Sequence, residues 1–211
     1  MQTKSERTRE RILDAAAEVL TERGYEARLT DIAARAGMQA GSLYYHFASR
    51  EELVGEVLRL AIEKSWDLVA AAVGRLPSAA TPLDRLAAAM AAHTRAVVGL
   101  STYASAEARI VGQLPNDLAR AHRKDTRAYG EYWHDLFDAA QRAGQVASHL
   151  DLFVIRMLAF GAMNWTSEWF RATDDAKIEQ LAEQTVWVFL NGVVGESPPF
   201  APTRNKERRT D

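Results

Sequence analysis

The 211-residue sequence contains no cysteine, which excludes a disulfide framework, a thiolate nucleophile and a metal site with cysteine ligands. Proline and glycine are scarce, with 6 and 12 residues, so the composition is not that of a disordered chain. No apolar run approaches the ~18 residues that a membrane span needs, and the charged N-terminus lacks the apolar core of a secretion signal. We therefore expect a cytoplasmic protein with no membrane partner.

An excess of one charge is also missing, because 26 basic residues face 28 acidic ones. This balance neither predicts nor excludes nucleic-acid binding, since a basic patch can lie on an acidic body. Enzyme signatures are absent too. The five histidines lack zinc-site spacing, and no nucleophile elbow, dinucleotide-binding turn or phosphate-binding loop occurs. We expect a protein that is not an enzyme and needs no metal or cofactor.

Helical periodicity is what the sequence has instead, and alternating strand patterns are missing. We predict an all-α fold with three helices in the first fifty residues and a bundle of about six more. The expected helices cover residues 5–23, 30–36, 40–47, 50–73, 83–98, 103–112, 117–143, 151–171 and 175–194. Gly24 is expected to end the first helix, Thr30 and Asn116 to cap helices, and Ser49 to Glu52 to form a capping box. These signals divide the chain at residue 50, into 1–50 and 51–195, with a flexible tail at 196–211.

The stretch LTDIAARAGMQAGSLYYHF, residues 29–47, reads as two short helices joined by a glycine turn, a helix-turn-helix. Leu43 and Phe47 lie four residues apart and are expected to hold the second helix to its neighbours. The other residues of this helix are shared between the core edge and a DNA groove. They are Gln39, Ala40, Gly41, Ser42, Tyr44, Tyr45 and His46. On pattern alone, a plain three-helix subdomain with an aromatic edge is an equally good interpretation.

Residues 9–58 resemble the DNA-binding domain of the tetracycline-repressor family, through ILDAAAEVLTERGY, LTDIAARAG, GSLYYHF and SREEL. The resemblance implies a homodimer that binds palindromic double-stranded operator DNA, with residues 1–50 as the DNA-binding domain. It also implies that residues 51–195 form a dimerisation domain, which binds a small effector and thereby releases the DNA. We expect effector binding to shift the helix at 50–73, which links the two domains, and so to change the spacing of the two recognition helices. A helical interaction module without a DNA function is the rival interpretation.

Two positions depart from the family pattern, because Gln39 replaces a common serine cap and Ala40 replaces a frequent lysine. Losing that lysine removes one phosphate contact, so more of the phosphate binding is expected of Arg50 and the N-terminal arm. Family members contact phosphate through residues matching Thr30 and the aromatic run. Pattern and resemblance together give the expected DNA contacts as Lys4, Arg7, Arg28, Thr30, Gln39, Ala40, Gly41, Ser42, Tyr44, Tyr45, His46 and Arg50.

Aromatic and polar residues in the C-terminal two-thirds have two interpretations: an ordinary helical core, or an apolar pocket with a few orienting polar groups. The resemblance favours a pocket. Its expected residues are Tyr103, Glu107, Arg127, Trp133, Phe137, Met163, Trp165 and Trp169. The runs NWTSEWFR and LAEQTVWVFLNGV are similar to family members that control fatty-acid or sterol-side-chain breakdown and respond to acyl-CoA. Arg123, Arg127 or Arg171 can then meet CoA phosphates, or form solvated surface pairs. An uncharged aromatic effector, as in regulators of drug efflux, is the alternative.

The last two expected helices each carry apolar residues that can pack on the body or form a two-fold contact between subunits. Ordinary packing within one chain is the alternative. The expected interface residues are Leu152, Ile155, Leu158, Ala159, Ile178, Leu181, Thr185, Val186 and Phe189.

Overall fold

The computed structural model describes residues 3–171 and 174–193, so the predicted tail at 196–211 lies outside the described residues. Its described part contains helices and no strands, which confirms the predicted all-α fold. The α-helices are α1 (Lys4–Arg23), α2 (Leu29–Arg35), α3 (Ala40–Leu43), α4 (Arg50–Gly74), α5 (Pro82–Arg95), α6 (Thr102–Ile110), α7 (Asn116–Asp125), α8 (Arg127–Arg142), α9 (Leu152–Trp169) and α10 (Asp175–Val193). A π-helical segment, η1 (Ala96–Leu100), precedes α6, and a 3-10 turn, η2 (Val111–Gln113), follows it.

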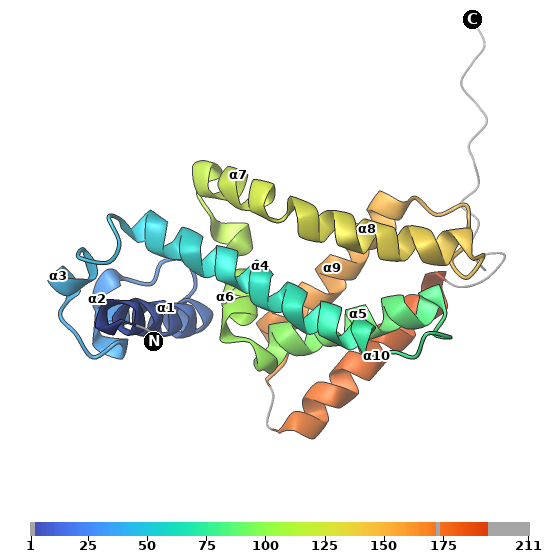
Figure 1. Ribbon diagram of the computed structural model, residues 1–211, viewed down its shortest axis with the longest axis horizontal. Coiled ribbons are helices and arrows are strands. Elements are labelled where there is room, and N and C mark those ends of the chain that lie inside the picture. The colour runs from blue at the N-terminus through green and yellow to red at the C-terminus, as the bar shows by residue number, and fades with distance from the viewer. Residues whose placement is uncertain (1–2, 172–173, 194–211) are drawn as a thin grey trace, which may run out of the picture.

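The molecule is elongated, with α1, α2 and α3 forming a head at one end (Figure 1). Helix α4 runs from the head into a bundle made by α5 to α10, and α7 and α8 follow each other along one side of that bundle. No helix among the described residues is long and apolar enough to cross a membrane. The arrangement leaves α3 at the tip of the head and α9 and α10 on the body.

Two hydrophobic clusters form the core, and α4 contributes to both. The first cluster fills the head and continues along α4 as far as Ala61. It also contains Tyr103, Ala106 and Ile110 of α6. The second cluster starts at Ile62 and fills the bundle. The core of the head therefore extends past residue 50, because α4 and α6 cover one side of α1.

Some predicted helix ends are confirmed. Gly24 ends α1 with φ +72°, a left-handed conformation that favours glycine, and its N–H donates to the Leu20 carbonyl at 2.8 Å. The Ser49 side chain accepts from the Glu52 N–H at 3.0 Å. The Glu52 carboxylate accepts from the Ala48 N–H at 2.6 Å. In a standard capping box it would accept from the N–H of the cap residue, Ser49.

Four local predictions are wrong. Thr30 does not cap α2, because the helix begins at Leu29. Asn116 is the first residue of α7 and follows Pro115 at the cap position. The single helix predicted for 117–143 is divided at Thr126, which carries no glycine or proline signal. The helix predicted for 40–47 ends at Leu43 and continues as a turn.

Candidate functional site

The tip of the head separates buried from exposed aromatic side chains. Leu43 and Phe47 are buried against α1, α2 and α4, as the sequence predicts. Between them, Tyr44 is 59% exposed and Tyr45 is 90% exposed. The turn is held by backbone bonds from the His46 and Phe47 N–H groups to the Leu43 carbonyl, at 2.9 and 3.0 Å. Two large aromatic side chains are thus held facing solvent by a rigid turn.

The other expected DNA contacts of the head lie at or near the surface. Gln39 and Gly41 are exposed, and Ala40, Ser42 and His46 are half-buried beside the tyrosines. Thr30 is exposed on the first turn of α2. The remaining exposed members of the predicted set are Lys4, Arg7 and Arg28. All the predicted DNA contacts are therefore exposed or half-buried, and none is fully buried.

Arg50 has a structural role that the sequence did not reveal. Its guanidinium stacks over the Tyr25 ring, 4.2 Å from the centroid. Its Nε donates to the Ala27 carbonyl at 3.3 Å, and its Nη2 donates to the Tyr25 carbonyl. These contacts fix the turn between α1 and α2 to the start of α4. The Arg50 guanidinium is thus already engaged by the chain, which leaves it less available for the predicted phosphate contact.

The same turn is also held by η2, the short segment that follows α6. Gln113 Oε1 accepts from the Tyr25 N–H at 2.9 Å, and Gln113 Nε2 donates to the Arg109 carbonyl at 3.0 Å. A Cβ atom at Gly24 would lie 2.9 Å from Gln113 Oε1, so a larger residue there would displace the Gln113 side chain. The α1–α2 turn is therefore hydrogen-bonded to the start of α4 and to η2.

A further contact between head and bundle involves Tyr103, which was predicted to line a pocket. Its hydroxyl donates to Asp14 Oδ1 on α1 at 2.7 Å, and its ring belongs to the head cluster. Burial, and to a smaller degree the Asp14 carboxylate, raise the Tyr103 pKa above its usual range, so the hydroxyl stays protonated and donates. Tyr103 thus joins α6 to α1, away from the aromatic core of the bundle.

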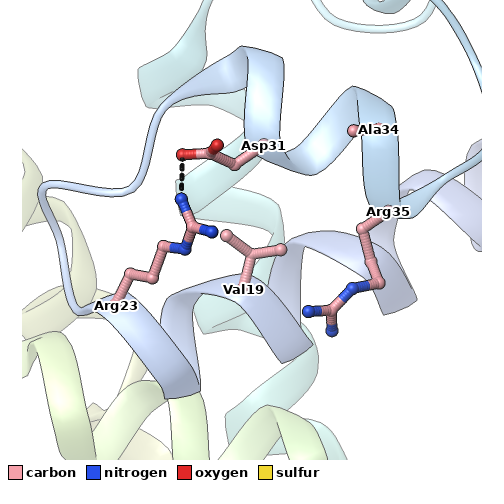
Figure 2. A pocket seen from close by; sticks show the side chains of 5 residues that line it. All are labelled: Val19, Arg23, Asp31, Ala34 and Arg35. Carbon is pink, nitrogen blue, oxygen red and sulfur yellow. Dashed lines mark ion pairs between the residues drawn. The ribbon is translucent and has the colours of Figure 1, made fainter.

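The head also has an open pocket of about 370 Å³ between α1 and α2, lined by Val19, Arg23, Asp31, Ala34 and Arg35. Figure 2 shows Arg23 reaching Asp31 across it, and the pair is 2.8 Å apart. On its far side, Arg35 pairs with Glu18 at 2.7 Å and with Glu22 at 2.8 Å. The hydrogen bond from Arg35 lowers the pKa of Glu22. These ion pairs bridge α1 and α2.

The predicted pocket residues of the bundle separate into a buried and an exposed group. Trp133, Phe137 and Met163 are fully buried in the second cluster. Glu107 is half-buried and its Oε1 lies 2.9 Å from Nε2 of the buried His122. Arg127 is exposed and pairs with Glu131 at 3.1 Å. Trp165 and Trp169 are 65% and 57% exposed, so in the single chain they line the surface of α9 and not the core.

Polar side chains of α5, α8 and α9 meet inside the bundle. His93 Nδ1 lies 3.1 Å from the Tyr129 hydroxyl, and its Nε2 lies 3.0 Å from Asn164 Oδ1. Burial lowers the pKa of His93 and raises that of Tyr129, so both side chains are neutral. Sequence reasoning missed this network, because its three members lie far apart in the chain. The described residues contain no group of acidic and histidine side chains that could hold a metal ion.

Helices α9 and α10 expose a large amount of apolar surface. The exposed apolar side chains here are Phe153, Val154, Met157, Leu158, Trp165, Trp169, Trp187 and Val188, and we call them the α9–α10 face. Six of these residues lie on α9 and two on α10, and contiguous apolar surface of this kind is rare on monomeric soluble proteins. Of the predicted interface residues, Leu158 belongs to this face, and four are buried in the chain's own core: Ile155, Ala159, Ile178 and Leu181. Leu152, Thr185, Val186 and Phe189 are half-buried.

A helix-turn-helix head on a helical bundle with an open apolar face defines the architecture of a DNA-binding regulator. Two family models match the chain: bacterial regulatory proteins of the tetR family over residues 12–57, and the tetracyclin repressor-like C-terminal domain over residues 79–193. The chain belongs to the tetracycline-repressor family, as the sequence resemblance predicted. This is a family of transcriptional regulators and not a class of enzymes.

Three relatives illustrate the similarity. The HTH-type transcriptional repressor KstR2 of Mycobacterium tuberculosis is 29% identical over 191 residues, covering 88% of this chain and 92% of the relative. The structure of this ketosteroid transcriptional regulator has a TM-score of 0.73, with 26% identity and coverage of 92% and 98%. AibR in complex with isovaleryl coenzyme A and operator DNA has a TM-score of 0.74 at 23% identity, with coverage of 86% and 97%. FadR from Bacillus subtilis in complex with stearoyl-CoA has a TM-score of 0.70 at 21% identity, with coverage of 87% and 98%.

Proposed function

We propose that this chain is a repressor that binds a palindromic operator as a homodimer and leaves it when an acyl-CoA thioester binds in the bundle. The DNA-binding part rests on one observation at the tip of the head: two tyrosine side chains are exposed between two buried apolar side chains. Tyr45 is 90% exposed, although Leu43 and Phe47 on either side are buried. At this exposure the Tyr45 ring does not take part in the core of the head, and a tyrosine hydroxyl donates readily to a DNA phosphate.

In the proposed complex, Tyr44, Tyr45 and His46 donate to the phosphates beside the major groove, and Thr30 donates at the start of α2. Gln39 and Ser42 face the base edges, where Gln can pair with adenine. Ala40 and Gly41 allow the backbone to approach the DNA closely. The exposed Lys4, Arg7 and Arg28 supply positive charge for the backbone, and Arg50 supports them by fixing the α1–α2 turn.

The α9–α10 face supports the homodimer. A two-fold axis can cover the same apolar patch on both subunits at once, and it presents two heads to successive turns of the duplex. Trp165, Trp169 and Trp187 supply large aromatic surfaces of the kind enriched in interfaces. In this arrangement, the two tryptophans predicted to line a pocket contribute to the contact between subunits.

The effector part of the proposal rests on the bundle and on the relatives. The interior is apolar and aromatic around Trp133, Phe137 and Met163, with a small polar network beside them. Such a composition is typical of sites for hydrophobic ligands with a few polar groups. AibR and FadR, which share the fold, are described with isovaleryl coenzyme A and stearoyl-CoA. These similarities favour acyl-CoA over an uncharged aromatic effector.

Release of DNA is proposed to pass through α6 as well as α4. Glu107 and Arg109 join α6 to α7 and α9 through His122 and Glu168, while Gln113 holds the α1–α2 turn. An effector that separates the bundle helices changes the position of α6 and with it the spacing of the heads. It does so only as far as it binds the two states with different affinity.

Fluorescence anisotropy with duplexes selected from random DNA by the purified protein tests the DNA-binding proposal. We expect affinity to fall steeply with salt, and Tyr45→Phe to weaken binding by about 3- to 10-fold through loss of one phosphate contact. Tyr132→Phe is the matched control, because this half-buried tyrosine lies on α8 and its variant should bind as the wild type does. Absence of salt-dependent binding, or equal loss in both variants, contradicts the proposal.

A further inference from the structure

A hydrogen-bond chain in the bundle uses both nitrogens of His93. The ring is 5% exposed and neutral, because burial lowers its pKa. A neutral imidazole carries one N–H, and an amide oxygen can only accept, so Nε2 donates to Asn164 Oδ1. The Nδ1 atom then accepts from the Tyr129 hydroxyl. Each polar atom of His93 is therefore satisfied by the protein.

Trp133 lies beside these hydrogen-bonded side chains, and its own indole N–H has no hydrogen-bond partner. Its ring meets His93 and Tyr129 edge-on, with centroid distances of 5.7 and 6.1 Å. The side chain is fully buried, yet its indole Nε1 has no hydrogen-bond partner. The indole acts on the pKa of the Tyr129 hydroxyl as a weak hydrogen-bond donor would, against the larger raising effect of burial. The contact falls short of hydrogen-bond geometry, so Nε1 stays without a full partner. Buried donors are almost always paired with protein, water or a ligand, so this N–H is available to an incoming acceptor.

The surroundings of Trp133 restrict which acceptor fits. The interior around Trp133 is apolar and aromatic, so a carboxylate buried there would lose its hydration. The Glu107 carboxylate already contacts His122 Nε2 at 2.9 Å, and Arg109 nearby on α6 is already paired with Glu168. Neither is left as a ready partner for a second carboxylate. The acceptor must therefore be a neutral oxygen.

We infer that the indole N–H of Trp133 donates a hydrogen bond to the thioester carbonyl oxygen of the effector. This inference rests on the proposed acyl-CoA function and adds the chemical group that is recognised and the residue that recognises it. A thioester places one neutral acceptor between an apolar chain and the coenzyme. The acyl chain of the effector then extends along Phe137 and Met163, which belong to the same buried cluster. A free fatty acid would instead bring a carboxylate into this apolar interior.

The test compares each thioester with a thioether in which a methylene group replaces the carbonyl. The probes are isovaleryl-CoA with S-isopentyl-CoA, and stearoyl-CoA with S-octadecyl-CoA, titrated calorimetrically into the full-length protein. We expect the wild type to bind at least one thioester about 3- to 10-fold more tightly than its thioether, the effect of one neutral hydrogen bond. Trp133→Phe, which keeps an aromatic ring and removes the N–H, should bind both members of the pair equally.

Trp66→Phe is the matched control, because Trp66 packs in the same aromatic group, 5.6 Å from the Tyr129 ring, and its variant should keep the preference. If Trp133→Phe does not fold, β-(3-benzothienyl)alanine at position 133 keeps the shape of the indole and lacks the N–H. Equal binding of thioester and thioether by the wild type, or an unchanged preference without the N–H, overturns this inference alone. Failure of all four CoA compounds to bind overturns the acyl-CoA proposal together with it.

Discussion

Replacing Leu158 by alanine is expected to weaken association of the chain with itself. Leu158 is 62% exposed on α9 and belongs to the α9–α10 face. Complete burial of a leucine side chain contributes about 1.5–3 kcal/mol, so covering the exposed part contributes about 1–2 kcal/mol. In the proposed two-fold dimer the residue enters the interface twice, so the substitution removes about 2–4 kcal/mol of dimerisation free energy. That loss raises the dimer dissociation constant by about 30- to 1,000-fold.

Sedimentation equilibrium over a range of protein concentrations measures this constant directly. Val111→Ala is the matched control, because Val111 is a 40% exposed apolar residue on η2, outside the α9–α10 face. Thermal unfolding followed by circular dichroism checks that both variants fold. A monomeric wild type, or a Leu158→Ala variant that associates as tightly as Val111→Ala does, would refute the reasoning.

Three further predictions concern the head and the buried network. Gln113→Ala should loosen the α1–α2 turn, so the Tyr25 amide should exchange its hydrogen faster while amides of α8 keep their protection. Arg50→Ala should lower the free energy of unfolding by about 1–3 kcal/mol, because two carbonyl contacts and a stacked ring are lost, and urea titration measures this against Arg75→Ala. His93 has a pKa below the usual 6.5, so the unfolded chain binds its proton more readily. Stability should therefore be complete above pH 6.5 and fall as the pH drops through this value, and His93→Gln should flatten that part of the profile.

Each of these three predictions has an outcome that contradicts it. Equal hydrogen-exchange rates of the Tyr25 amide in the wild type and in Gln113→Ala would mean that Gln113 does not stabilise the turn. Equal urea midpoints for Arg50→Ala and Arg75→Ala would assign Arg50 no structural role. A pH profile of the same slope with and without His93 would mean that its buried, neutral state does not contribute to the acid limb.

The sequence predicted the elements whose signals are local. Gly24 and the run from Ser49 were sufficient to place the end of α1 and the start of α4. The sequence does not predict that the helix is divided at Thr126. The φ and ψ of this residue, −75° and −7°, are still in the helical region, and no glycine or proline marks the break. Tertiary packing of α7 on α4 and of α8 on α5 divides this stretch, and such contacts are not encoded in a local window.

The sequence predicts which residues form a helix better than it predicts whether a side chain on that helix points into the core or to solvent. The tryptophans of α9 have the spacing of a core stripe, but in the single chain they are exposed. Their assignment to a ligand pocket stays a prediction. A helix that is apolar nearly all round gives no periodicity that identifies its inner face. The contacts of Arg50 and Gln113 with the α1–α2 turn depend on backbone atoms more than twenty residues away, which no motif reveals.

The most direct test of the whole account measures operator affinity with and without effector. Fluorescence anisotropy of a selected duplex, at one fixed salt concentration, is followed while stearoyl-CoA or isovaleryl-CoA is added to the wild-type protein. The account predicts that a CoA thioester that binds the bundle lowers the affinity for the duplex, by at least the 5-fold that a coupling of about 1 kcal/mol produces. A thioester that binds, as shown by calorimetry, and leaves the affinity for DNA unchanged would contradict it.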